Sequence, residues 1–248
     1  VVQLLLEHSE RIELNARNSY GDTAFMHACS NGYKDVVKLL LDHSGSENID
    51  FNAKDNRIGN TGFMFACKKG HTNVVKLLLD HSDSKNIDLN VKDDIRDGMT
   101  PFMFTKTKEV AELILGDERI DVNATDNGNG TILDYLCGRD ETLYHEDFTE
   151  EQIVETLDFL LHSHRIDYPN EDVSPLHTAC FYGHEARVET ILKVVKEKGI
   201  DINAKNVNGR TLRDEIIRGS IIDDIEDYSE ATYKILNIDP SVDLKRRQ

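Results

Sequence analysis

Cysteine and histidine are the side chains of this sequence most suited to metal binding or nucleophilic catalysis. A zinc site needs four such ligands around one point, and a reactive thiol needs an exposed, electropositive setting. The cysteines have neither arrangement, because each lies six residues after a hydroxyl residue that should start a helix. The four pairs are Thr23 and Cys29, Thr61 and Cys67, Thr131 and Cys137, and Ser174 and Cys180.

This shared position places the four cysteines on the buried faces of equivalent helices. Packed helices lie about 8–10 Å apart, whereas a disulfide needs Cα atoms within about 7 Å. We therefore expect reduced thiols that fill a small apolar position, and no metal site. Reduced thiols indicate an intracellular compartment, and we expect a cytoplasmic or nuclear protein.

Histidines recur at the end of leucine-rich segments. In the last turn of a helix such a ring interacts favourably with the helix dipole. Their spacing puts them on successive units, too far apart to share one metal ion. These residues are His8, His43, His81 and His162.

Catalytic and phosphate-binding motifs are missing from the sequence. It contains no G-x-S-x-G nucleophile motif and no G-x-x-x-x-G-K-[ST] phosphate loop. The glycine pair at 128 and 130 is expected to form a turn. We predict that the chain is not an enzyme, with no catalytic residue and no cofactor.

Two short amphipathic segments within residues 59–81 must position these side chains. Thr61 should cap the first helix and Gly70 should end it in a left-handed conformation. Asn73 should cap the second helix, whose valines and leucines form a broad apolar stripe. Two helices this short cannot bury their apolar faces alone, so the unit should recur.

The unit recurs over residues 21–43 and, more weakly, over residues 174–192. Between the helix pairs lies a short string of the form I-D-x-N-A-K. Its asparagine is found at Asn15, Asn52, Asn90, Asn123 and Asn203, and Tyr168 takes its place in a degenerate copy.

Two further strings show which family these units are similar to. Residues 174–179 read S-P-L-H-T-A, with a Gly-His pair at 183–184, and residues 70–79 read GHTNVVKLLL. A period of about 33 residues, with a turn and two helices, is typical of ankyrin arrays. Over about residues 1–220 the sequence resembles the ankyrin repeat family.

The resemblance implies an all-α solenoid of helix-turn-helix units with β-hairpin-like finger loops. We expect a single ankyrin repeat domain over residues 1–248. Its expected parts are a partial repeat helix at 1–11, repeats at about 12–48, 49–86, 87–119, 120–165, 166–199 and 200–236, and a tail at 237–248. Residues 1–8 have the pattern of a second helix whose first helix is missing, and we expect the chain to be a fragment of a longer protein.

Three departures from the family pattern have structural consequences. Repeat three lacks the Gly-His break, so a helix must be shortened or the turn between helices remodelled. Repeat four carries an acidic insertion at 138–152, which could be a functional loop or a solvated insertion. In repeats one to three a methionine replaces the family histidine kept at His177, so apolar packing should replace hydrogen bonds between repeats. These methionines are Met26, Met64 and Met103.

The net charge of −17 argues against nucleic acid, whose recognition needs a basic face, and against anionic membranes. The charge fits a basic partner or simply high solubility. No apolar run approaches the ~18 residues of a membrane span, and no signal peptide is visible.

The resemblance also maps partner contacts onto the fingertips and the exposed side of each first helix. Phe181 and Tyr182 are the clearest hint, because exposed aromatic residues often anchor interfaces; alternatively, Phe181 packs sideways against repeat four. Lys68, Lys69, Arg57 and Arg96 would form a basic band that favours an acidic peptide. The mapped contacts are Ser19, Tyr20, Asp22, Ser30, Asn31, Asn56, Arg57, Ile58, Asn60, Lys68, Lys69, Ile95, Arg96, Met99, Phe181, Tyr182, Val207, Asn208 and Arg210.

The resemblance also suggests a covalent modification, the hydroxylation of an asparagine. Some ankyrin repeats are hydroxylated at the asparagine of an L-x5-D-[VI]-N string, and residues 115–123 fit it. Asn123 is therefore a candidate acceptor.

The predicted function is a monomeric, non-catalytic module that binds a protein or peptide on the concave face of the repeats. An alternative is a targeting or regulatory segment of a larger enzyme or signalling protein. A third possibility is an array that serves as a spacer, without a dedicated partner.

Overall fold

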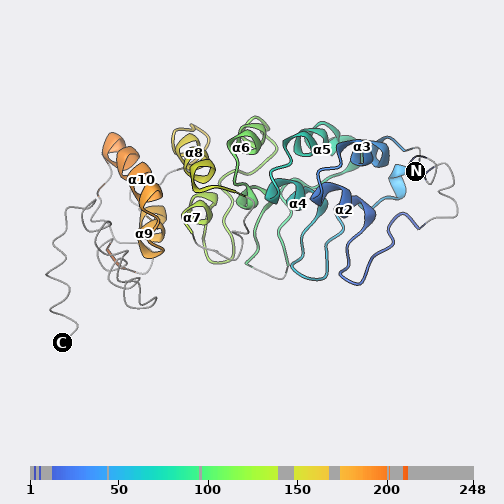
Figure 1. Cartoon of the computed structure of the whole chain (residues 1–248), viewed down its shortest axis with the longest axis horizontal. Coiled ribbons are helices and arrows are strands. Elements are labelled where there is room, and N and C mark those ends of the chain that lie inside the picture. The colour runs from blue at the N-terminus through green and yellow to red at the C-terminus, as the bar shows by residue number, and fades with distance from the viewer. Residues whose placement is uncertain are drawn as a thin grey trace. The chain divides into compact units, whose positions relative to one another are not determined.

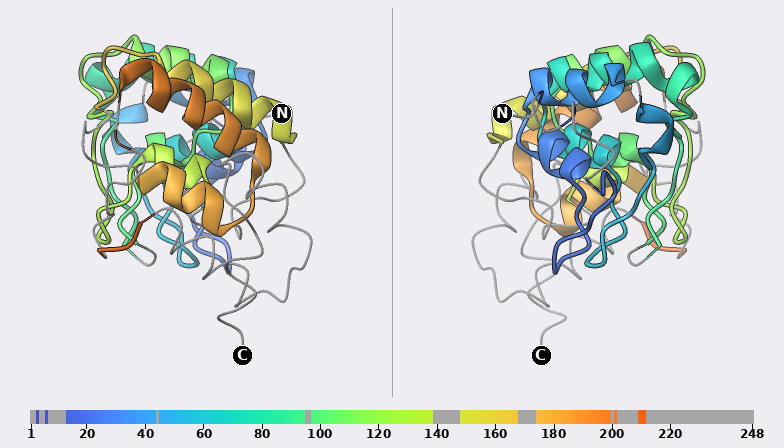
Figure 2. Two further views of the ribbon diagram at one scale, coloured as in Figure 1. Left: turned by 90° about the vertical axis from the view of Figure 1, so that its left-hand side faces the viewer. Right: turned by 90° about the vertical axis from the view of Figure 1, so that its right-hand side faces the viewer.

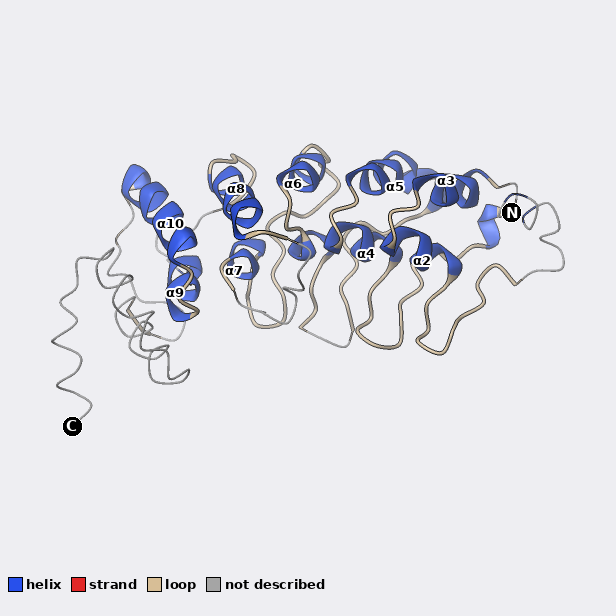
Figure 3. Cartoon of the chain, in the orientation of Figure 1, coloured by secondary structure: helices blue, strands red, loops and turns tan. Residues whose placement is uncertain are grey.

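Helices and connecting loops make up the described part of this computed structural model, which contains no strand there (Figures 1 and 3). The described residues are 3, 6, 13–43, 45–94, 97–138, 148–167, 174–199, 201 and 209–211. The chain divides into two compact units, Val1–Ile132 and Leu133–Gln248.

The first unit stacks its helices in two layers (Figure 2). The inner layer, next to the finger loops, consists of α2 (Ala24–Ser30), α4 (Gly62–Lys68) and the 3-10 helix η3 (Pro101–Phe104). The outer layer consists of α3 (Lys34–Asp42), α5 (Thr72–Lys85) and α6 (Lys108–Leu115). A short 3-10 turn, η2 (Ser46–Asn48), follows α3.

The inner helices begin where the sequence predicts. The hydroxyls of Thr23 and Thr61 accept hydrogen bonds from the backbone N–H of Met26 and Met64, so both residues are N-caps. The sulfur of Met26 in turn accepts from the N–H of Thr23 at 3.5 Å. Met26 also packs with Ala53 and Phe65 of the next repeat, so at this one of the three methionine positions apolar packing takes the place of the family histidine.

Two expectations about the outer helices are wrong. Asn73 does not cap α5, because the helix starts at Thr72 and its N-cap is His71, whose side chain makes no capping bond. His81 is not in the last turn, because α5 continues to Lys85. Its ring still lies 2.9 Å from the carbonyl of Leu77, one turn earlier.

Repeat three is remodelled, as its missing Gly-His break predicts. The single 3-10 turn η3 replaces the first α-helix, and α6 follows after three residues. The residues of η3 are nevertheless buried, so the shortened element still fills the core between its neighbours.

Close contact between α2 and α4 requires the small residue at the start of α4. A Cβ on Gly62 would lie 2.6 Å from Cε1 of Phe25. Cys29 and Cys67 occupy equivalent places on these two helices and are fully buried, as predicted. Burial raises the pKa of both thiols, and Cys67 contributes to the rise at Cys29.

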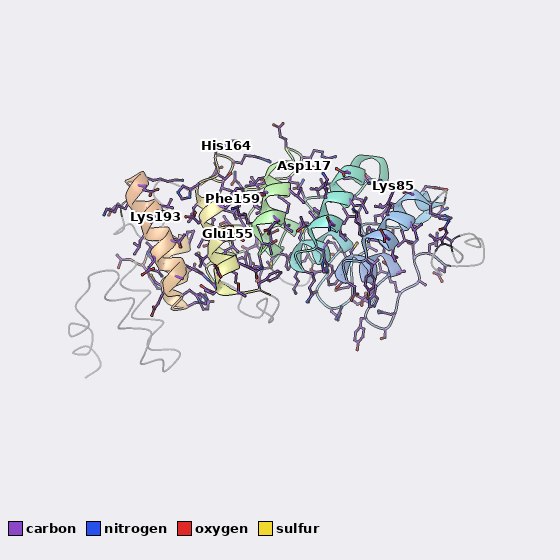
Figure 4. All side chains as sticks on the ribbon, turned by 45° about the horizontal axis from the view of Figure 1, so that its top comes forward. Lys85, Asp117, Glu155, Phe159, His164 and Lys193 are labelled. Atoms are coloured by element: carbon purple, nitrogen blue, oxygen red, sulfur yellow. The ribbon has the colours of Figure 1, made fainter. Side chains whose placement is uncertain are left out.

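The described part of the second unit contains two helix pairs. α7 (Ile132–Leu136), which starts at the boundary, and α8 (Glu150–Leu161) form the first, and α9 (Ser174–Phe181) and α10 (Glu185–Lys198) form the second. α10 packs against both α8 and α9; in Figure 4, Glu155 and Phe159 mark α8 and Lys193 marks α10. Cys137 and Cys180 are buried here. Most of the acidic insertion, residues 139–147, lies outside the described residues.

Candidate functional site

The finger loops of the first unit are closed in one recurring way. In repeat two, the N–H of Asp55 donates to the carbonyl of Asn60 at 3.0 Å, and the Asp55 carboxylate accepts from the N–H groups of Arg57, Ile58 and Gly59. The residue that turns the chain has positive φ in each finger: 82° at Gly21, 75° at Gly59, 74° at Gly98 and 61° at Asn129. The fingers are therefore hairpin-like without forming strands.

A ladder of asparagine side chains joins the base of each finger to the next repeat. Asn52 donates from Nδ2 to the carbonyl of Asn86 at 2.7 Å, and its Oδ1 accepts from the N–H of Asp88 at 2.8 Å. Asn15 makes the same two bonds with Asn48 and Asp50, and Asn90 with Arg119 and Asp121. The recurring N of the sequence string thus sets the spacing between fingers.

A second ladder, of cations, lies two residues further along. Arg17 donates to the carbonyl of Lys54, Lys54 to that of Lys92, and Lys92 to that of Thr125, each at 2.7 Å. Both ladders tie neighbouring repeats through their backbones. We therefore expect neighbouring fingers to be held in fixed positions, so that their tips form one ordered surface.

Tyr20 and Arg57 form the most prominent fingertip feature. The guanidinium carbon of Arg57 lies 5.0 Å from the centre of the Tyr20 ring, and its Nη2 lies 3.3 Å from Oδ1 of Asp22. The two backbones are also joined, because the N–H of Asn56 donates to the carbonyl of Tyr20 at 3.0 Å. Tyr20 remains 57% exposed, so its ring is available to a partner.

Three of the sequence-mapped contacts are corrected by burial. Asn60 and Met99 are fully buried and Asp22 is 8% exposed, so their side chains are not available to a partner. Asp22 has a structural role instead, because its carboxylate pairs with Arg57 of the next finger. The position after each turn glycine points inward, where the sequence suggested an outward contact.

The remaining mapped residues fall into three groups. Ser19, Tyr20, Asn31, Asn56 and Arg57 are exposed; Ser30, Ile58, Lys68, Lys69, Tyr182 and Arg210 are half-buried. Ile95, Arg96, Val207 and Asn208 lie outside the described residues, as does the side chain of Phe181.

The cations of the proposed basic band already make contacts within the chain. Arg57 pairs with Asp22 and lies 3.9 Å from Asp55. Lys68 extends over the ring of Phe104, with Nζ 5.8 Å from its centre. Lys69, beside it, caps the end of α4. Lys68 and Lys69 are adjacent at the end of α4, and both are half-buried.

Sequence reasoning missed two exposed side chains. Tyr33, 59% exposed, precedes α3 at the place where other repeats have a histidine after glycine. His27, on the exposed side of α2, lies 3.9 Å from Asp22. The signal for His27 was its position next to the buried Met26, because neighbouring helical residues point to different faces.

Neither a metal-binding group nor a membrane-spanning helix is found among the described residues. Within them, no group of three or more His, Cys, Asp or Glu residues could hold a metal ion. No helix of the described chain is both long and apolar enough to cross a membrane.

Models of a known protein family match these repeats. The family model for three copies of the ankyrin repeat matches residues 1–55 and 47–126, and the single-repeat model matches residues 171–207. The chain belongs to the ankyrin repeat family. The predicted fold class, an all-α ankyrin repeat solenoid, is confirmed.

Solved ankyrin repeat structures resemble this chain in fold. The human ASB11 ankyrin repeat domain has a TM-score of 0.62 at 15% identity, covering 94% of this chain and 96% of that one. The ankyrin repeat domain of Bcl-3, described as a unique member of the IkappaB protein family, has a TM-score of 0.60 at 17% identity, covering 90% of each chain. A comparison with curated protein sequences found no significant match.

Ankyrin repeats are generally protein-protein interaction modules and are generally non-catalytic. This general property agrees with the character of the first unit, in which ordered fingers carry exposed aromatic and polar side chains. The question for this chain is therefore which residues would contact a protein partner.

Proposed function

We propose that this ankyrin repeat chain binds a protein partner through the fingertips and inner-helix ends of its first unit. The exposed Tyr20 ring, held against Arg57, is the observation that carries the proposal. Tyrosine and arginine are common interface anchors, and their fixed geometry lowers the entropy cost of binding. Ser19, Asn31 and Asn56 would supply the polar surroundings.

The chemistry of these residues favours an acidic peptide segment as the partner. Lys68 and Lys69 follow one another at the end of α4, and Arg57 lies on the finger of the same repeat. On a chain with net charge −17, a local group of cations would attract an acidic segment and repel acidic segments elsewhere. We propose the half-buried Ser30 and Ile58 as secondary contacts of the first unit, and the half-buried Tyr182 and Arg210 as contacts of the second unit by itself.

The test compares two variants, each of which loses one exposed tyrosine. Tyr20→Ala combined with Lys68→Ala and Lys69→Ala removes the proposed anchor and cations. Tyr33→Ala removes an equally exposed tyrosine outside the proposed surface. Arg57 is left intact, because its loss would remove the guanidinium that pairs with the buried Asp22 carboxylate. Each chain is used to capture proteins from a cell extract, and recovery is quantified by mass spectrometry.

The proposal expects a set of proteins that the parent chain and Tyr33→Ala recover equally. The triple variant should recover them at least about tenfold less well, as expected for loss of a hot spot of about 1.4 kcal/mol or more. Their recovery should fall with added salt. Equal recovery by all three chains would contradict the proposal.

We propose further that the chain is monomeric in the cytosol or nucleus and that Asn123 is a hydroxylation acceptor. The buried free thiols support a reducing compartment. Asn123 is half-buried, and its N–H donates to the Asp121 carboxylate at 3.1 Å. Light scattering tests the mass, cell fractionation the compartment, and a peptide spectrum after incubation with an asparaginyl hydroxylase tests the added oxygen.

A further inference from the structure

A buried arginine in the second unit occupies a place where the best-formed repeat has a valine. Three residues after the Gly-His pair, repeat two has Val74, which is 1% exposed, and repeat five has Arg187, which is 2% exposed. Burying a guanidinium costs far more free energy than burying a valine unless its charge and N–H groups find partners. The partners of Arg187 therefore indicate what it does.

Arg187 binds two elements of repeat four at once. Its Nε lies 2.9 Å from Oε1 of Glu150 and its Nη2 lies 2.5 Å from Oε2. Its Nη1 donates to the carbonyl of Leu136 at 3.0 Å. Leu136 is the last residue of α7 and Glu150 is the first residue of α8. One planar guanidinium therefore holds the end of one helix and the start of the next.

The same end of α7 is also held by the turn that precedes α10. A Cβ on Gly138 would lie 2.7 Å from Nε2 of His184 and 3.1 Å from Cβ of Tyr182. The rings of Tyr182 and His184 stack at 6.4 Å. The chain leaving α7 thus passes directly over repeat five, in an approach that only glycine allows.

The two members of the ion pair differ in exposure. The Arg187 side chain is 3% exposed and that of Glu150 is 46% exposed. If Glu150 is neutralised, the buried guanidinium loses the carboxylate that binds its Nε and Nη2, which is strongly unfavourable. If Arg187 is replaced by an apolar residue, the carboxylate that remains is solvated. The two changes should therefore have unequal effects on stability.

We propose that Arg187 is a latch that fixes the junction between α7 and α8. It orders the two helix ends of repeat four and contributes little to the stability of the whole chain. An apolar residue at this place, as in repeat two, would occupy the core without binding either helix end. Only a forked, charged side chain can bind the carbonyl of Leu136 and the carboxylate of Glu150 together.

The test compares Arg187→Val, Glu150→Gln and the double variant in the full chain. Glu151→Gln is the matched control, because Glu151 is the exposed neighbour of Glu150 in the same helical turn. Thermal unfolding reports stability, and amide hydrogen exchange reports local order at residues 136–138 and 150–153. Exchange in α5 serves as an internal reference in the other unit.

The latch predicts that Arg187→Val changes the melting temperature little but raises exchange at both helix ends by about tenfold or more. Glu150→Gln should lower the melting temperature by several degrees, and this loss should vanish in the Arg187→Val background. The control should change neither quantity.

Three outcomes would overturn the inference. One is an Arg187→Val chain that fails to fold or melts as early as Glu150→Gln, since the arginine would then be needed for stability. The second is unchanged exchange at 136–138 and 150–153 in Arg187→Val. The third is an additive effect in the double variant, which would mean that the two side chains do not act together.

Discussion

His71 of the second repeat reaches back to the first, where its Nε2 lies 3.0 Å from the carbonyl oxygen of Ser30. Because a carbonyl only accepts, the ring must carry its proton on Nε2. Gly32 leaves room for the ring, since a Cβ there would lie 2.7 Å from Nδ1 of His71. The histidine after glycine thus ties two repeats together.

We expect His71→Ala to lower the free energy of unfolding by about 1 kcal/mol, the usual value of such a hydrogen bond. Urea unfolding monitored by circular dichroism measures the change. His164→Ala, which removes an exposed histidine from a loop, is the control and should be neutral. A neutral His71→Ala would show that the bond between repeats contributes nothing.

The asparagine ladder offers a substitution that changes only one atom type. Asn52→Asp keeps the acceptor for the N–H of Asp88 but loses the donor to the carbonyl of Asn86 and adds a charge beside it. We expect a loss of about 1–3 kcal/mol in unfolding free energy. Asn56→Asp, at an exposed fingertip, is the matched control. Equal stability of the two variants would argue against the ladder.

Acidification should destabilise the second unit through His184. Burial, reinforced by the nearby charge of Arg187, lowers the pKa of His184 from 6.5 to about 4, although Glu150 acts in the opposite direction. Between these values the unfolded chain binds a proton that the folded chain does not. Stability is therefore lost as the pH falls through this window.

The slope due to His184 should reach at most about 1.4 kcal/mol per pH unit. Comparing the parent chain with His184→Gln between about pH 7 and about pH 4 isolates it from the carboxylates, which titrate in both chains. The variant should show a shallower decline. Parallel curves would mean that the ring keeps its ordinary pKa when folded.

The four cysteines should be unreactive in the folded chain. All are buried, and burial raises the pKa of the Cys29, Cys67 and Cys180 thiols, which leaves almost no thiolate at neutral pH. A colorimetric thiol reagent should titrate four groups in denaturant and react in the native state only as fast as the chain opens. Rapid native labelling of any one would place that cysteine at the surface.

Local signals identified the repeats reliably because each is carried by neighbouring residues. Thr61 caps a helix through its own following turn, Gly59 and Gly70 occupy left-handed conformations, and the recurring asparagine marks each finger. Asn73 was assigned wrongly because a good capping residue lay one position inside a helix that begins without a side-chain cap. The missing Gly-His break predicted that repeat three is irregular, and the structure showed which alternative holds, because the 3-10 turn η3 replaces its first α-helix.

The sequence by itself determined the family, the periodicity and the buried place of the cysteines, because these depend on spacing along the chain. Only the tertiary structure showed that Asn60 and Met99 point inward. It also showed that Arg57 forms an ion pair with Asp22. In the second unit it showed that Arg187 binds Leu136 and Glu150. These partners are separated by 35 to 51 residues. Stacking of one repeat on another brings them together, so the pattern of a single repeat does not reveal them.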